Sequence, residues 1–198
     1  MSQAGREPGE QPTLDALRAA TGAAHRELDE RLIFVRSPRR EATVAYLAAF
    51  LAFLAPRERR VWAQPQLEDL DPRRRLAKAR WLREDLERLG GMPVPEDDPG
   101  DLGPWPRALG VAYVLEGSTL GSQVLRRRPG LDTLRYLEGY GEATGPMWLA
   151  LIERLEREGR DRAAREAIVD GAASTFDDLH SWLEVAGCMA PTRSDRAS

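Results

Sequence analysis

Apolar residues recur at three- and four-residue spacing along most of the chain, which is the period of an α-helix. The first such segment spans about 13–32. A second, 40–55, is apolar nearly all round, so we expect it to be buried. Pro56 should end or kink this second helix. A third periodic segment runs from about 72 to 89 and stops at the pair Gly90-Gly91.

A stretch rich in proline and glycine, 90–106, separates these helices from the rest. A loop of this length could mark a domain boundary. We interpret it as a loop within one domain, because each half would hold too few residues for a complete core. The helical pattern then returns over about 107–127, 131–140, 145–158 and 160–185. With no alternating strand pattern of any length, the sequence predicts an all-α, single-domain bundle of about seven or eight helices.

Three glycines interrupt the helical segment 110–125, GVAYVLEGSTLGSQVL. Each costs about 1 kcal/mol relative to Ala inside a helix, so their presence needs a physical reason. Gly117 and Gly121 are four residues apart and share a helix face. Close packing against another helix and a flat ligand against the backbone explain this spacing equally well. Tyr113, one turn earlier, favours a ligand because its hydroxyl could hold a carboxylate, and Ser118 could order a water.

A histidine, His25, lies within the first helical segment. A single histidine in such a place is more often a structural, half-buried residue than a ligand, but its neighbours favour a ligand. Asp29 follows at i+4 and Arg18 precedes at i−7, on roughly the same face. A carboxylate commonly orients a metal-bound imidazole, and an arginine can pair with a ligand carboxylate. Haem binding requires both an axial iron ligand and a propionate partner.

The composition excludes several classes of function. The 198 residues include 29 Lys plus Arg against 32 Asp plus Glu, a net charge of −3 that is not typical of nucleic-acid binders. One cysteine, Cys188, excludes an intrachain disulfide and a Cys-based metal cluster. Two histidines, His25 and His180, exclude a site with three His ligands. Only one basic residue, Lys78, is a lysine, which we attribute to coding bias.

We expect a cytoplasmic protein. The longest charge-free apolar run is 43–55, shorter than the roughly 20 residues that a membrane-spanning helix needs. The first residues, MSQAGREPGEQPT, lack the apolar core of a signal peptide. A single cysteine also fits a reducing compartment.

The segments that carry the candidate residues resemble a known family. LRAATGAAHRELDERL at 17–32 and YVLEGSTLGSQVL at 113–125 resemble the proximal and distal helices of haem oxygenases. The likeness is closest to the bacterial enzymes, including those encoded beside bacteriophytochromes. Two later stretches, YGEATGPMW at 140–148 and AASTFDDLHSWL at 172–183, are similar to the C-terminal helices of the family. The resemblance covers about 12–186.

This resemblance implies a haem-oxygenase-like multi-helix bundle over 12–188, with haem between a proximal and a kinked distal helix. The tails 1–11 and 189–198 would be disordered. Haem b would be both cofactor and substrate. O₂ and an external electron donor would convert it to biliverdin, CO and ferrous iron, with the α isomer as the default. The chemistry would belong to the cofactor, while the protein binds and orients it.

The family's roles carry over residue by residue. His25 matches the proximal iron ligand. Asp29 falls where the family usually has a Glu that hydrogen-bonds this histidine. Arg18 falls where a Lys often contacts a propionate, and Tyr113 matches a Tyr with the same role.

The distal segment matches the family at three further positions, with two departures. Gly117, Ser118 and Gly121 would lie over the haem. Ser118 takes the position of an Asp in animal enzymes, and in the bacterial branch an ordered water there delivers the proton. Ser122 replaces a usual glycine and would crowd the pocket slightly.

An arginine run, 126–128, ends the distal segment. Cations at a helix C-terminus complement its dipole, and this explanation is as strong as docking of an acidic partner. The resemblance implies a ferredoxin, flavodoxin or reductase as electron donor, with Arg126 and Arg127 as candidate contacts. It also implies a bacteriophytochrome as a biliverdin acceptor. The near-neutral charge and the short apolar runs predict no nucleic-acid or membrane partner. We interpret His180 as structural or surface-exposed, and assign Cys188 no role.

Two other hypotheses stay open at this point. A non-catalytic haem binder or carrier on the same fold would keep His25 but would not need the distal glycines. A helical ligand-binding or regulatory domain, of the kind seen in thiamin-salvage enzymes, would need a nucleophilic cysteine and carboxylate pairs that are not evident here.

Overall fold

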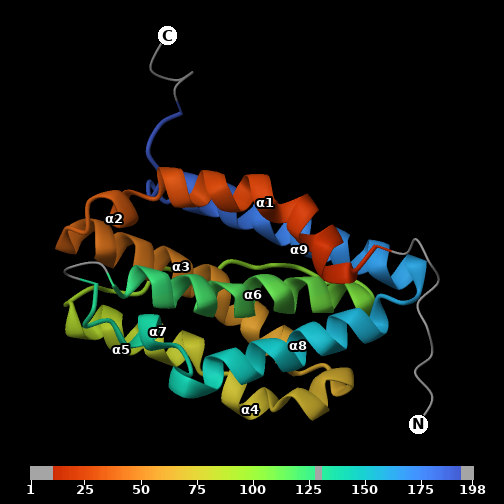
Figure 1. Cartoon of the computed structure of the whole chain (residues 1–198). Helices are drawn as coiled ribbons and strands as arrows, with labels where there is room; N and C mark the ends of the chain where they lie inside the picture. Colours follow the sequence, from red (N-terminus) through yellow and green to blue (C-terminus); the bar gives the residue numbers. More distant parts are fainter. Residues whose placement is uncertain (1–10, 128–130, 193–198) are drawn as a thin grey trace.

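The structure, a computed structural model, describes residues 11–127 and 131–192 (Figure 1). Over these residues it is helical, with one isolated β-bridge, so the all-α prediction is confirmed. The helices are α1 (Thr13–Arg31), α2 (Ile33–Arg36), α3 (Arg40–Trp62), α4 (Pro72–Arg75), α5 (Lys78–Arg88), α6 (Trp105–Leu125), α7 (Arg135–Glu138), α8 (Thr144–Glu158) and α9 (Arg162–Val185), with 3₁₀ turns η1 (Pro65–Leu70) and η2 (Gly141–Ala143).

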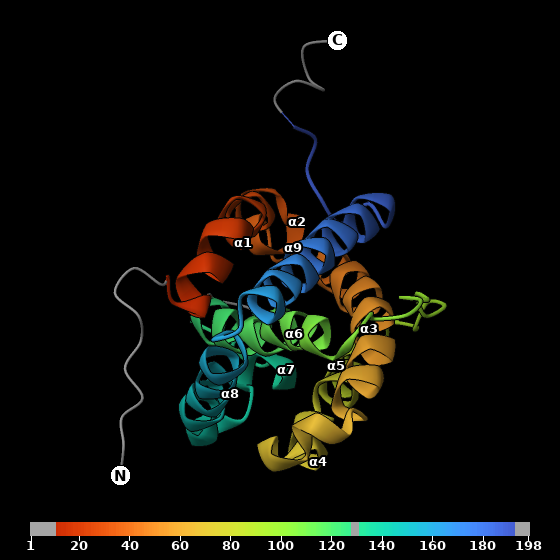
Figure 2. The same ribbon diagram turned by 90° about the vertical axis from the view of Figure 1, so that its right-hand side faces the viewer.

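Helix α6 lies in the middle of the bundle, with α1 on one side and α4 on the other (Figures 1 and 2). Both α1 and α6 pack against α9. At the crossing of α6 and α9 the backbones meet directly, because a Cβ on Gly110 would overlap the backbone near Ile168, and one on Gly171 would overlap that of Arg107. Close helix packing is therefore the reason for these two glycines.

Helix α3 is buried on nearly all sides, as its sequence predicts. It does not end at Pro56 but continues to Trp62. A proline inside a helix leaves the carbonyl four residues earlier without its usual N–H partner. Here the backbone N–H of Asp97 donates to the oxygen of Ala52 at 3.1 Å. The proline is therefore tolerated because the loop supplies the missing donor.

The proline-rich loop packs against α3. The guanidinium of Arg57 donates to Asp97 at 2.5 Å, and Arg59 forms a two-pronged ion pair with Glu96. Arg57 also donates to the carbonyl of Phe53, which lies in the same helix. These contacts hold the loop on the surface of the bundle.

The segment after α9 is packed, contrary to the expected disorder from residue 189. Met189 forms an antiparallel bridge with Leu32, and the N–H of Ala190 donates to Arg31 at 2.8 Å. Cys188 and Met189 are buried. The segment is held in place because the side chains of Cys188 and Met189 are buried where α1 meets α2. Residues 1–10 and 193–198 lie outside the described part of the chain.

None of the helices in the described ranges is both long and apolar enough to cross a bilayer.

Candidate functional site

A cavity of about 470 Å³ lies between α1 and α6, with further wall residues from α2, α3, α7, α8 and α9. Its walls are mostly apolar, with aromatic rings such as Phe34, Phe50 and Phe176. Pockets of this size with a few polar groups are typical of small-molecule and cofactor sites. Six of the seven predicted site residues line it: His25, Asp29, Tyr113, Gly117, Ser118 and Gly121.

His25 and Asp29 form a pair on the α1 wall of the cavity. The Nδ1 atom of His25 lies 3.1 Å from Oδ2 of Asp29. The i,i+4 spacing places both side chains on one helix face. The Phe176 ring of α9 packs against the imidazole in an edge-to-face arrangement, with 6.1 Å between the ring centroids. Because Asp29 occupies Nδ1, Nε2 is the nitrogen left for a ligand.

The two distal glycines face open space. A Cβ on Gly121 would meet nothing within 4 Å, and one on Gly117 would only touch the Trp148 ring at 3.9 Å. Helix packing therefore explains Gly110 but not this pair. The observation favours the ligand interpretation, because the backbone of α6 is bare toward the cavity.

This difference gives a matched pair of substitutions. Gly121→Ala should stabilise the ligand-free protein by up to about 1 kcal/mol, because Ala is the better helix former and the space is open. Gly110→Ala should destabilise it by about 1–3 kcal/mol, because its Cβ meets backbone that cannot rotate away. Urea unfolding of the two variants measures whether each substitution raises or lowers the free energy of unfolding. Equal effects would mean that both glycines serve packing.

If the cavity holds haem, as the family resemblance implies, the same Gly121→Ala variant should slow its oxidation, since the added methyl enters the space beside the bare backbone. Gly121→Leu should slow it further, with a larger share of the electrons supplied by the donor reducing O₂ to hydrogen peroxide. Single-turnover spectra with haemin measure this effect. Unchanged turnover in the stabilised Ala variant would contradict the distal assignment.

Two serines and a tyrosine meet at the α6 wall. Tyr136 Oη donates to Ser118 Oγ at 2.9 Å. Ser118 Oγ donates to the carbonyl of Leu115 at 2.6 Å, and Ser122 Oγ donates to the carbonyl of Ser118 at 2.7 Å. Burial raises the pKa of Tyr136 to about 12, because it disfavours the phenolate. Tyr136 was not among the predicted site residues, because it lies in a one-turn helix that is too short to show a helical periodicity.

Tyr113 lies on the α6 wall, and Arg18 lies outside the cavity. Burial raises the pKa of Tyr113, while a hydrogen bond with Thr21 and the charge of Arg18 oppose the rise. The side chain of Arg18 is 66% exposed and 3.9 Å from Asp15. The structure thus places Arg18 near Tyr113 but not among the lining residues. Propionate binding by the two residues stays a prediction.

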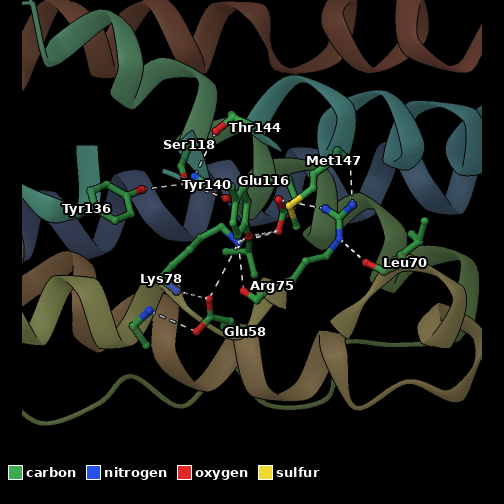
Figure 3. Close-up of polar contacts among 12 residues, drawn as sticks. Glu58, Leu70, Arg75, Lys78, Glu116, Ser118, Tyr136, Tyr140, Thr144 and Met147 are labelled. Carbon is green, nitrogen blue, oxygen red and sulfur yellow. Dashed lines mark hydrogen bonds and ion pairs between the residues drawn. The ribbon is translucent and has the colours of Figure 1, made fainter. Parts of the chain in front are cut away.

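A buried ion cluster, formed by Glu58, Arg75, Lys78 and Glu116 with Tyr140, lies behind the distal segment (Figure 3). Lys78 is fully buried, and its Nζ meets Glu116 Oε1 at 2.6 Å, Tyr140 Oη at 2.6 Å and the carbonyl of Arg75 at 3.4 Å. Three acceptors match the three N–H donors of a lysine. Arg75 pairs with the other oxygen of Glu116 at 3.0 Å.

The cluster ties α6 to α3 and α5. The carboxylate of Glu58 accepts from the N–H groups of Lys78 and Ala79, at the start of α5. Burial raises the pKa of Glu58, while the charge of Lys78 opposes the rise. Because Glu116 directly precedes Gly117, the cluster fixes the position of the bare distal backbone. Lys78 is the only lysine in the chain, and this was the one feature of the sequence that could have pointed to the cluster. The attribution to coding bias alone overlooked this structural role.

The arginines at the end of α6 are exposed. Arg126 lies 3.4 Å from Glu138, and Arg127 is exposed beside it. Arg128 lies outside the described residues. His180 pairs with Glu27 on α1 at 3.0 Å and does not line the cavity.

The fold is that of the haem oxygenases. The structure matches the NO- and CO-bound heme oxygenase of Neisseria meningitidis with a TM-score of 0.73. The match covers 93% of this chain and 98% of that one, at 22% identity.

A sequence relative agrees. The chain is 35% identical over 108 residues to a protein of Xanthomonas campestris pv. campestris named heme oxygenase. This match covers 52% of the chain and 64% of the relative, so it spans less than two thirds of the relative's length. No family model matches the chain. The resemblance to the haem oxygenase family is confirmed by these two matches.

Proposed function

We propose that the protein is a haem oxygenase, which cleaves haem to biliverdin, CO and ferrous iron with O₂ and external electrons. One observation carries the proposal. The imidazole of His25 and the bare backbone at Gly117 and Gly121 line the same cavity. The haem oxygenase fold and the sequence relative support it.

The residues present fit haem. A porphyrin is a flat apolar group, and the cavity offers apolar walls with a helix face that lacks side chains. His25 Nε2 would bind the iron, and Asp29 would hold the ring in one orientation. Tyr113 and Arg18 would meet the propionates. When bound, the haem supplies the oxidative chemistry.

The chain's own contribution is to bind, orient and control water. Phe34, Phe50 and Phe176 line the cavity, and their apolar rings would keep bulk water from a bound haem. Gly117 and Gly121 would let a bound haem approach the backbone of α6 closely. Ser118 and its partners supply hydrogen-bonding oxygens at that wall.

We further infer an acidic electron donor, a ferredoxin, a flavodoxin or a reductase, that docks at Arg126 and Arg127. Exposed arginines at the end of α6 support this inference. A bacteriophytochrome would accept the biliverdin, and the reaction would take place in the cytoplasm. If opposite charges guide this docking, the donor should reduce the haem-loaded protein more slowly at high salt, because salt screens the attraction.

The test is a single turnover with haemin. Adding haemin to the purified protein should give a Soret band, and ascorbate in air should make it decay with formation of a bilin. Chromatography of the product identifies the isomer. A stable Soret band that ascorbate does not bleach would instead support the haem carrier, and no Soret band would rule out both.

A further inference from the structure

Tyr46 places a polar group at an apolar end of the cavity. Its ring stacks between those of Phe34 and Phe50, with 3.9 Å and 5.4 Å between the ring centroids, and all three residues line the cavity. The interplanar angles are 15° and 10°, so the three rings lie nearly parallel. Because Phe34 and Phe50 are themselves buried, they fix the plane of the phenol and the direction of its C–O bond.

The phenol oxygen of Tyr46 has no hydrogen-bond partner in the part of the chain that the structure describes. It is not sealed from solvent, unlike unpartnered atoms such as Nε1 of Trp62. The groups close enough to influence its ionisation include Tyr136 and Asp29, which also line the cavity. We therefore place the oxygen at the cavity surface. Burial raises the pKa of Tyr46 well above its usual value, so the phenol keeps a proton to donate.

This phenol lies at the opposite end of the cavity from Tyr113. The α1 wall runs from Thr21, which is hydrogen-bonded to Tyr113, to Leu32, about 16 Å further along the helix axis. Helix α2 follows directly, and its Phe34 is the ring that stacks on Tyr46. A haem whose propionates meet Tyr113 would therefore turn its opposite edge toward Tyr46.

The edge of haem opposite the propionates changes its chemistry during ring opening. In haem this edge carries only carbon substituents, so it offers a phenol no acceptor. Opening the ring at the bridge carbon of this edge gives the α isomer of biliverdin, with a lactam oxygen on each of the two new terminal rings. A donor at this end of the cavity therefore distinguishes product from substrate, because the acceptor exists only in the product.

We propose that the phenol of Tyr46 is a product-binding group, which donates a hydrogen bond to a lactam oxygen of biliverdin at the end of the cavity away from Tyr113. The proposal rests on the proposed function, because it takes haem as the substrate. In the product complex the phenol gains the partner that it lacks in the free protein. Tyr46 then slows the release of the product without tightening the binding of haem.

The test compares Tyr46→Phe with the wild type in the full chain, because this change removes one oxygen and keeps the stacked ring. Titrations with haemin and with the α isomer of biliverdin, followed by absorbance and by tryptophan fluorescence, measure the two affinities. The affinity for biliverdin should fall about two- to tenfold, as for the loss of one hydrogen bond, while that for haemin stays within about twofold. Biliverdin should dissociate faster by a similar factor.

A second phenol and a second bilin serve as matched controls. Tyr113→Phe removes a phenol at the propionate end, which haemin and biliverdin share, so it should weaken both ligands by about the same factor. The γ isomer of biliverdin is opened between the two propionate-bearing rings and carries its lactam oxygens at that end. Its affinity should be the same for Tyr46→Phe and the wild type.

Unfolding of the haem-free protein gives a readout that needs no ligand. Tyr46 has no partner to lose, so Tyr46→Phe should unfold at the same urea concentration as the wild type or at a higher one. Tyr140→Phe removes a phenol that is hydrogen-bonded to Lys78 and Glu116, and should unfold at a lower one. A loss in Tyr46→Phe as large as in Tyr140→Phe would overturn the proposal, because the phenol would then have a structural partner.

The ligand titrations separate the two proposals. If the wild type bleaches haemin and Tyr46→Phe binds the α isomer as tightly as the wild type, the product-binding role alone is overturned. Equal losses for haemin and biliverdin, or for the α and γ isomers, overturn it as well, because the phenol would then support the cavity in general. A wild type that forms no haem complex overturns the proposed function, and the product-binding role with it.

Discussion

Replacing His25 by Ala should still admit haemin weakly but remove most turnover and the six-coordinate low-spin spectrum at high pH. The reason is that His25 is the imidazole that lines the cavity, with Asp29 at 3.1 Å to hold its ring. Haemin titration and single-turnover spectra measure the loss. Imidazole added to the His25→Ala protein should restore part of the spectrum, because it can enter the space that the side chain leaves.

Two further variants sharpen this test. Asp29→Asn keeps the shape but not the charge of the partner, and should lower haem affinity or turnover about 10- to 100-fold. His180→Ala removes the other histidine, which pairs with Glu27 outside the cavity, and should keep the spectrum. If His25→Ala and the wild type have the same spectrum and turnover, His25 is not the ligand.

Glu116→Ala should be the most destabilising of the substitutions considered, by about 3–5 kcal/mol. It would leave Lys78 and Arg75 buried with their main counter-charge removed. Domains of this size are commonly stable by only about 5–15 kcal/mol, so the variant should unfold at much lower urea. Urea unfolding of the haem-free protein, followed by circular dichroism, measures the change.

Glu96→Ala is the matched control, because Glu96 pairs with Arg59 on the surface. Exposed pairs of this kind contribute about 0–1 kcal/mol, so this variant should unfold close to the wild type. Similar losses in Glu116→Ala and Glu96→Ala would show that the buried ion cluster does not hold the bundle together.

Local patterns in the sequence predicted most of the helices, because each amphipathic face repeats within a few residues. The same reasoning placed His25 beside Asp29 and put Gly117 and Gly121 on one face, since those pairs are four residues apart. The prediction that α3 ends at Pro56 was wrong, because the N–H donor that replaces the lost hydrogen bond comes from Asp97 in a distant loop.

Contacts between different helices could not be predicted from these local repeats. Tyr136 and Ser118 are 18 residues apart, and Lys78 and Glu116 are 38 residues apart. The two members of each pair lie in different helices, so only the folded chain brings their polar atoms together. Arg18 shows that a shared helix face is not sufficient either. It lies on roughly the same face of α1 as His25, yet it does not line the cavity.

The pairing of Met189 with Leu32 has a consequence for biosynthesis. The helix that carries His25 leaves the ribosome before α9, yet it packs on α9 and is joined at its far end to residues made about 150 positions later. Contacts so distant in sequence form slowly, and not before both partners have been synthesised. A nascent chain would thus expose the apolar face of α1 until α9 follows, and haem capture would have to wait for that late docking.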